Sequence, residues 1–317
     1  MKRPNLFCDA SLCVVGNINR DVTVHGIRSS SLLLKDGETS VSRITETIGG
    51  GGANSACAAA ALGARVHFVG KVGADALGDQ LRSAMARHGV RMALAKSRNC
   101  ATGTTVALGL NSGHRHFLSC LPNNESLRFE DLDLTALSRW KHLLRADVWF
   151  SSQMLEEGNQ QLLSLARHHG LVTSLDINFD PVWSSGVARE VRQRKRLLRR
   201  ILPLVDMAHG NARELKEFTD SPDLNSALKR LTQWGVGSVV AHLGSSGAGF
   251  YCNKELVVEP AHQARQTVNS TGTGDVLSIC MILLSESTRL TVRQKLRLSN
   301  RVVREYMEGR LELIPSL

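Results

Sequence analysis

Residues 269–275 read NSTGTGD and run directly into the apolar segment 276–284, a pattern that predicts a glycine-pinned turn followed by a buried helix. Backbone N–H groups in the first turn of a helix have no intrahelical partners and lie at the positive end of the helix dipole. The amides of residues 272–274 are therefore candidates to bind a phosphate or a developing oxyanion. Asp275 would stand beside that anion and could take a proton from a hydroxyl nucleophile. The alternative is a glycine loop that caps a core helix, with Asp275 as a first-turn acid.

Length and composition predict a large globular α/β domain. With 317 residues, 42% of them hydrophobic, the chain can bury a sizeable core. No run approaches the roughly 18 uninterrupted apolar residues of a membrane span, and the N-terminus lacks the apolar region of a signal peptide. We therefore expect a cytoplasmic protein without a membrane partner. The cysteines are odd in number and lack paired metal spacing, which predicts reduced core thiols and no zinc site.

The net charge of +10 favours an anionic ligand or, less specifically, nucleic acid. Much of the excess lies in residues 189–200, where Val191, Leu197, Leu198 and Ile201 form the apolar side of an amphipathic surface helix. Only 4% of residues are aromatic and none lies within this run, so the stacking platforms of single-strand binders are missing. A nucleic-acid-binding protein is thus the hypothesis with the least support, and we expect no nucleic-acid partner.

Strand and helix patterns alternate along the chain. This succession predicts an α/β fold with a doubly wound, mostly parallel sheet flanked by helices, and ligands at the carboxyl ends of its strands. Strands are expected at 12–16, 66–69, 148–151, 172–177, 207–209 and 239–242, and helices at 53–62, 76–88, 160–169, 189–200, 214–218 and 226–234.

Two segments, about 20–48 and 101–121, depart from this alternation. Their polar and apolar residues alternate, with turn signals at Asp36-Gly37 and Ser112-Gly113, which indicates antiparallel strands. We expect them to form a small β-sheet lid over the site. Because no internal repeat or low-complexity linker is present, residues 1–317 are interpreted as one domain with this lid.

A second glycine-rich stretch, residues 49–52, precedes Ala53, Asn54 and a helix of small residues. It brings backbone and one amide side chain close to the cleft. As a dinucleotide-binding fingerprint it is poor, because it lacks the G-x-G-x-x-G spacing and a suitably placed acidic residue. Close packing of the small-residue helix on the sheet is the alternative interpretation.

The segment 49–79, GGGGANSACAAAALGARVHFVGKVGADALGD, resembles the N-terminal signature of the ribokinase-like (PfkB) carbohydrate kinases, and NSTGTGD resembles their C-terminal signature. The resemblance covers nearly the whole chain, since other family segments follow in the right order. They are VVGNINRD at 14–21, ATGTTVALGLNSGHR at 101–115, SLDINFDPVW at 174–183, HGNARE at 209–214 and VVAHLGSSGAGFY at 239–251. It implies an ATP- and Mg²⁺-dependent kinase that phosphorylates a hydroxyl of a sugar or nucleoside, in a ribokinase-like fold, with homodimers formed through the lid.

The resemblance also implies roles for individual residues. The base is Asp275, and the anion hole is formed by Gly272, Thr273 and Gly274. The nucleotide side comprises Asn211, Glu214, His242, Gly244 and Gly247, with Glu214 near Mg²⁺ through water. The substrate side comprises Asn19, Asp21, Gly50 and Asn54, although turn chemistry after a strand is an alternative role for Asn19 and Asp21.

Three departures from the family pattern limit what the resemblance implies. Asn269 replaces an Asp that is often associated with a monovalent-cation site, which makes potassium activation doubtful. Thr273 replaces a small residue, and His242 replaces Thr, with a partly buried, hydrogen-bonded histidine as the alternative to a functional role. Asn269, Thr273 and the charged last helix, which includes residues 300–306, keep open a second hypothesis, a catalytically weak protein of the same fold that senses a sugar or nucleotide. The acceptor is not named by the sequence, and a sugar phosphate remains among the candidates.

Overall fold

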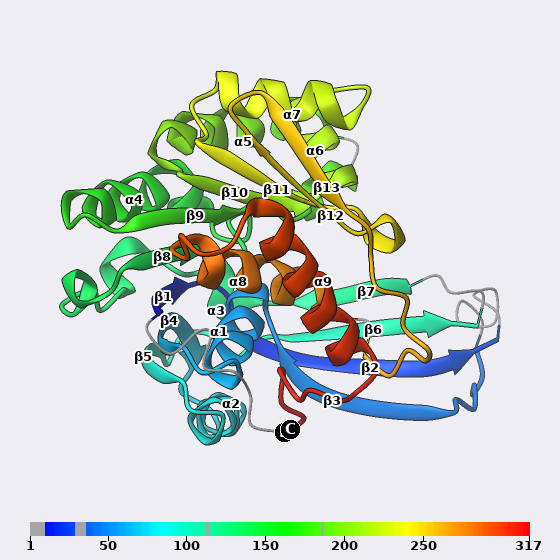
Figure 1. Ribbon diagram of the computed structural model, residues 1–317. Helices are drawn as coiled ribbons and strands as arrows, with labels where there is room; N and C mark the ends of the chain where they lie inside the picture. Colours follow the sequence, from blue (N-terminus) through cyan, green and yellow to red (C-terminus); the bar gives the residue numbers. More distant parts are fainter. Residues whose placement is uncertain (1–9, 29–35, 112–114, 185–186, 270) are drawn as a thin grey trace.

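The computed structural model describes residues 10–28, 36–111, 115–184, 187–269 and 271–317, which form two β-sheets and their helices (Figure 1). The large sheet has nine strands in the order β13-β12-β11-β10-β9-β8-β1-β4-β5. All its neighbouring pairs are parallel except β11–β12 and β12–β13 at one edge. The strands are β1 (Ser11–Val15), β4 (Arg65–Gly73), β5 (Arg91–Ser97), β8 (His142–Arg145), β9 (Val172–Asp176), β10 (Met207–Asn211), β11 (Ser238–His242), β12 (Ala248–Cys252) and β13 (Glu255–Glu259).

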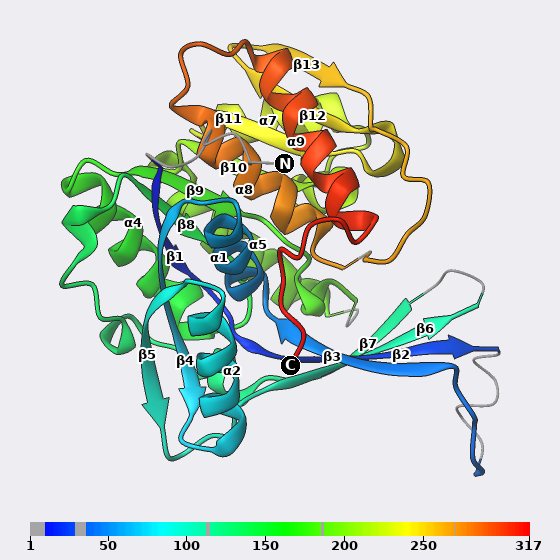
Figure 2. The same cartoon turned by 60° about the horizontal axis from the view of Figure 1, so that its bottom comes forward.

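Helices cover both faces of this sheet, which confirms the predicted α/β architecture. Strand β1 shows why both faces need cover, since Leu12 and Val14 pack in one apolar core while Cys13 and Val15 pack in the other. Helices α1, α2, α8 and α9 bury residues in the first core, and α4 to α7 in the second (Figures 1 and 2). The helices are α1 (Gly51–Ala61), α2 (Ala76–Arg87), α3 (Pro122–Glu125), α4 (Asn159–His168), α5 (Ala188–Ile201), α6 (Ala212–Thr219), α7 (Leu224–Gln233), α8 (Thr273–Ser285) and α9 (Val292–Met307).

The small sheet contains the predicted lid segments and projects to one side of the large sheet (Figure 1). Its order is β3-β2-β6-β7, with β2 (Asn19–Ile27), β3 (Arg43–Gly49), β6 (Thr104–Leu110) and β7 (Arg115–Cys120). The β2–β3 and β6–β7 pairs are antiparallel as predicted, but β2 and β6 join the two hairpins in parallel. The turn predicted at Ser112-Gly113 lies outside the described residues, whereas Asp36-Gly37 lies in a bend.

One predicted strand is wrong. Residues 148–151 form a turn, and the strand at this point of the sheet is the earlier β8. Trp149 is fully buried, and its Nε1 donates to the carbonyl of Ile177 at 2.6 Å. The apolar residues at this point therefore belong to the core without forming a strand. Strand β5, at the edge beside β4, was not predicted from the sequence.

The predicted basic helix is α5, with Leu198 and Ile201 on its buried side. Lys195 is buried as well. Its charge is balanced there, since its Nζ lies 2.8 Å from a carboxylate oxygen of Asp220 and 3.2 Å from one of Glu217. The solvent-exposed face of α5 therefore contains fewer basic residues than the sequence pattern suggests. None of the helices in the described part of the chain combines the length and apolar character needed to span a bilayer.

Candidate active site

Polar residues cluster where neighbouring parallel strands of the large sheet end. This is the edge at which ligands bind in open α/β sheets. Asn17 follows β1, Asp147 follows β8, Asp176 ends β9, Asn211 ends β10 and His242 ends β11. Helices α1 and α8 begin beside this edge, since Asn54 of α1 contacts Asp275 of α8.

The start of α8 contains the three predicted anion-binding residues, Gly272, Thr273 and Gly274. Gly272 is its N-cap, with a left-handed φ of 77°, and no side chain of the described residues caps the helix. A Cβ at this position would lie 2.4 Å from the Cδ1 atom of Ile314, the movable end of a side chain, so it is the left-handed conformation that favours glycine here. Thr273 and Gly274 follow as the first helical residues, where backbone amides lack partners within the helix.

Asp275, the predicted base, lies in the same turn. Its Oδ2 accepts a hydrogen bond of 3.0 Å from Nδ2 of Asn54. Burial raises the pKa of Asp275 to about 8; the Asn54 hydrogen bond opposes the rise, and the charges of Asp147, Glu214 and Asp21 add to it. A carboxyl group with a pKa near neutrality is suited to general base catalysis. Oδ1 of Asn54 is buried without a hydrogen-bond partner among the described residues, which leaves an acceptor for a substrate hydroxyl.

Asp147 is a site residue that the sequence analysis missed. Its carboxylate accepts hydrogen bonds from the backbone amides of Asn17 at 2.9 Å, Gly51 at 3.0 Å and Gly52 at 2.8 Å. It thereby occupies the N-terminus of α1 and ties that helix to the ends of β1 and β8. Burial raises its pKa, against the effect of these hydrogen bonds. The misplaced strand at 148–151 hid this position, because Asp147 fell before the expected strand instead of after it.

The predicted substrate residues on β2 lie next to the second glycine stretch. Nδ2 of Asn19 donates to Oδ1 of Asp21 at 2.7 Å. A Cβ at Gly49 would lie 2.0 Å from that Oδ1 atom, and one at Gly50, whose φ is 91°, would lie 2.5 Å from the carbonyl oxygen of Asn17. Gly49 thus leaves room for the β2 side chains beside the end of β3, and Gly50 lets the start of α1 approach the backbone that follows β1. Burial raises the pKa of Asp21 to about 6, with the Asn19 hydrogen bond lowering it and the Asp147 charge raising it.

Asn211 and Glu214 form a capping box at the start of α6. Oδ1 of Asn211 accepts from the backbone amide of Glu214 at 2.9 Å, and Oε2 of Glu214 accepts from that of Asn211 at 2.7 Å. The pair therefore has a structural role, and Oε1 of Glu214 stays outside the box. Burial raises the pKa of Glu214, and its charge raises the pKa values of Asp275 and Asp176. Glu214 thus shares one electrostatic cluster with the predicted base.

The turn between β11 and β12 contains Gly244 and Gly247, whose φ values are 59° and 106°. A Cβ at Gly247 would lie 2.1 Å from the carbonyl oxygen of Glu259, so the turn depends on that glycine. His242, just before the turn, has Nε2 at 3.1 Å from Oγ of Ser278 on α8, and burial lowers its pKa to about 4. This placement agrees with the alternative stated above, a partly buried and hydrogen-bonded histidine that is neutral at physiological pH.

A cavity of about 470 Å³ opens beneath the lid. Its walls include Asn54, lid residues Thr45 and Thr47, and Ile314 and Ser316 near the C-terminus. The C-terminal tail, residues 309–317, contributes because it runs along β3: the amide of Ile48 donates to the carbonyl of Pro315 at 3.2 Å, and that of Leu317 to Glu46 at 3.1 Å (Figure 2). Asn269 also lines the cavity, and its Nδ2 donates to the carbonyl of Tyr306 at 3.0 Å.

The model of the pfkB carbohydrate kinase family matches residues 9–278 of this chain. A ribokinase from Arabidopsis thaliana is 26% identical over 282 residues, which cover 84% of this chain and 68% of that protein. A fructokinase from Klebsiella pneumoniae is 27% identical over 247 residues, covering 77% of each. Among solved structures, an E. coli protein in complex with ATP and Mg²⁺ has a TM-score of 0.79 and 18% identity, with 94% of this chain and 93% of that one covered.

Proposed function

Because the chain belongs to the pfkB family of carbohydrate kinases, we propose that it transfers the γ-phosphoryl group of ATP to a hydroxyl of a sugar or nucleoside. The observation that carries the proposal is the pairing of Asp275 with Asn54 beside the first-turn amides of α8. Phosphoryl transfer requires a positioned hydroxyl, a base for its proton and stabilisation of phosphoryl charge. This site can supply all three.

In the proposed mechanism, Asp275 takes the proton of the acceptor hydroxyl as its oxygen bonds to the γ-phosphorus, while the bond from that phosphorus to the bridging oxygen breaks and ADP leaves. Asn54 holds the carboxylate through Nδ2, and its Oδ1 is available to a second substrate hydroxyl. Asn19 and Asp21 bind further hydroxyls at the root of the lid. The amides of residues 272–274 stabilise the charge on the transferring phosphoryl group, because the helix start holds these unpaired amides in place before the reaction.

The carboxylates around the site fit a magnesium ion bound together with ATP. Burial and the charges of Asp275, Glu214 and Asp147 raise the pKa of Asp176 well above its ordinary value, so a cation among these carboxylates would favour their ionised forms. The described residues contain no group of three ligands placed to hold a metal directly. We propose contact through water, from Oε1 of Glu214, since Mg²⁺ usually keeps several waters. The ion would neutralise charge on the phosphates.

A coupled ADP-release assay across pentoses, hexoses, their phosphates and nucleosides tests the proposal. We expect turnover with at least one of these acceptors. Thermal-shift measurements with the same compounds provide a parallel readout, because binders of the native state raise the melting temperature. Stabilisation by a sugar or nucleotide without turnover of any acceptor would instead support the sensor hypothesis.

The activity is expected to depend on pH through Asp275. Its pKa is raised to about 8, and the base must be ionised to accept a proton. Below about pH 8, kcat/KM for the acceptor should therefore fall about tenfold per pH unit, and above it the profile should level. Steady-state rates at saturating ATP, from about pH 6 to about pH 9, measure this limb. A flat profile across this range would contradict the assignment of the base.

We also propose that the lid pairs with a second copy of the chain. Three large apolar side chains of the lid are exposed: Ile44 by 59%, Phe117 by 52% and Leu118 by 54%. Replacing Phe117 by aspartate should convert a dimer into a monomer, because burying an unpaired charge in an apolar interface is costly. Analytical ultracentrifugation reads the mass, with Val258→Asp on β13 as the control. A monomeric parent protein would refute this proposal.

A further inference from the structure

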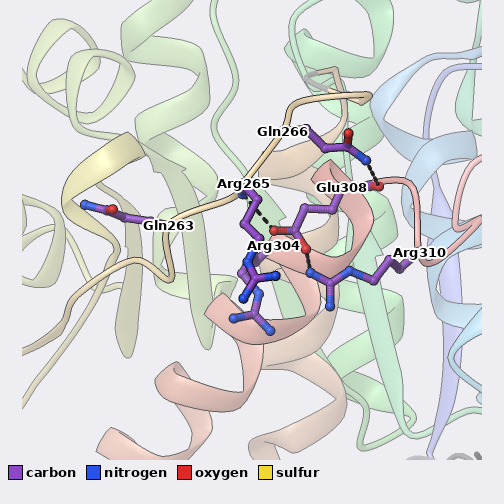
Figure 3. A pocket seen from close by; sticks show the side chains of 6 residues that line it. All are labelled: Gln263, Arg265, Gln266, Arg304, Glu308 and Arg310. Carbon is purple, nitrogen blue, oxygen red and sulfur yellow. Dashed lines mark hydrogen bonds and ion pairs between the residues drawn. The ribbon is translucent and has the colours of Figure 1, made fainter.

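A second cavity of about 470 Å³ lies between the loop that precedes α8 and the end of α9. Its lining contains three arginines, two glutamines and one glutamate, and Figure 3 shows the arginines converging around the glutamate carboxylate. The residues of this arginine pocket are Gln263, Arg265, Gln266, Arg304, Glu308 and Arg310. None of them belongs to the site described above.

The positive charge in the arginine pocket exceeds what its one carboxylate can balance. Glu308 is buried and pairs with Arg310, while its Oε1 accepts from the backbone amide of Arg265 at 2.8 Å. The side chain of Arg265 is thus not needed for that contact. Because Glu308 pairs with Arg310, the guanidinium groups of Arg265 and Arg304 have no carboxylate of the lining left to balance them.

Arg304 is incompletely satisfied. Its Nη2 lies 3.8 Å from a carboxylate oxygen of Glu305, which is also 3.2 Å from Nε of Arg301. Nε of Arg304 is buried and has no hydrogen-bond partner among the described residues. A buried donor on a charged group without a partner is costly, and it indicates that a ligand completes its contacts.

We propose that the arginine pocket binds a phosphate dianion, either free or as the phosphate ester of a small metabolite. Guanidinium groups match phosphate oxygens through paired, charge-assisted hydrogen bonds. The lining holds more arginines than carboxylates, so an anion with two negative charges would balance its excess positive charge. This pocket is separate from the amides of residues 272–274, where the transferred phosphoryl group is placed.

The bound anion would fasten the loop before α8 to the end of α9. The two segments already meet, since the carbonyl of Met307 accepts from the amides of Val268 at 2.7 Å and Asn269 at 3.1 Å. The hydroxyl of Tyr306 donates to the carbonyl of Thr271 at 2.9 Å, directly before Gly272. An anion held by Arg265 of the loop and Arg304 of α9 adds a bridge to the same pair of segments.

Isothermal titration of the full chain with inorganic phosphate tests the site. Arg265→Gln and Arg304→Gln should each weaken binding by about tenfold or more, because each removes charge-assisted hydrogen bonds. Arg265→Gln keeps the backbone contact to Glu308, so loss of the fold does not complicate its result. The matched control is Arg301→Gln, on the same helix and 59% exposed, which should bind phosphate like the parent.

Two further measurements locate the anion. Phosphate should slow hydrogen exchange of the amides of residues 265–269 in the parent but not in Arg265→Gln. A crystal structure with tungstate, a phosphate mimic, should show the metal among the three arginines. Inorganic phosphate and glucose 6-phosphate, titrated in parallel, distinguish the two forms of the ligand. Tighter binding of glucose 6-phosphate would identify a phosphate ester, and tighter binding of inorganic phosphate would identify the free anion.

Equal phosphate affinity of the parent and both pocket variants, no phosphate binding at all, or tungstate bound only at the first turn of α8 would each overturn the proposal. These readouts do not depend on turnover, so they are independent of the kinase assignment.

Discussion

Replacing Asp275 by asparagine is expected to lower kcat by about a hundredfold to ten-thousandfold, the range that a general base contributes. The change removes the proton acceptor but keeps the shape of the side chain. Asparagine can still accept the hydrogen bond from Nδ2 of Asn54, so the contact between α1 and α8 is retained. Burial raises the pKa of Asp275 to about 8, and replacing this buried acid with a neutral group should not weaken the fold. Single-turnover rates and calorimetric ATP affinity separate the loss of chemistry from a loss of binding.

The matched control is Asp79→Asn. Asp79 also lies in the first turn of a helix, α2, but it is exposed and pairs with Lys96 at 2.7 Å. This variant should keep the parent kcat. If Asp275→Asn turned over at a nearly normal rate, another group would have to accept the proton. An equal loss of ATP affinity and kcat would instead show a structural role for Asp275.

Local patterns in the sequence were sufficient to predict the helices and strands that carry the signatures. The turn before α8 was predicted because glycines precede an apolar run, and Gly272 takes a left-handed φ of 77° there. The parallel sheet followed from the alternation of strands and helices. The family resemblance, drawn from the order of several weak motifs, is confirmed by the family match over residues 9–278.

The region around Asp147 could not be predicted from apolar patterning. Strand β8 ends in Arg145, which is fully buried because its Nε donates to Oδ1 of Asn159 at 2.7 Å and its guanidinium also contacts backbone carbonyls. Burial lowers the pKa of Arg145 to about 10. A charged residue usually indicates a surface position, so the sequence pattern placed the predicted strand at the apolar residues 148–151 that follow. A buried charge satisfied by tertiary partners is not visible in sequence patterns.

The pairing of segments that are distant in the chain could not be predicted from the sequence either. The lid hairpins were predicted from local alternation and turn residues, but the parallel pairing of β2 with β6 depends on how the hairpins meet in space. The C-terminal tail showed no strand pattern, yet Ser316 pairs with Thr47 of the lid. Both contacts join residues that are far apart in the chain.

Asn54→Ala is expected to raise KM for the acceptor by about tenfold to a hundredfold, the usual cost of losing hydrogen bonds to charged or reacting groups. The KM for ATP should change little, because Asn54 lies on the side of the lid cavity and contacts Asp275 only through Nδ2. Initial rates with each substrate varied at saturation of the other measure both constants. The neighbouring Ser55→Ala is a matched control, since Ser55 is buried on the same helix and its Oγ has no hydrogen-bond partner among the described residues.

The same variant should also shift the pH profile, which distinguishes a positioning role from a purely structural one. The hydrogen bond from Asn54 stabilises the ionised form of Asp275 and thereby lowers its pKa. Without it, the pKa rises further above about 8, and the acidic limb of kcat/KM moves to higher pH. Ser55→Ala should leave the limb in place. If Asn54→Ala raised both KM values equally and left the limb unmoved, Asn54 would not hold the base.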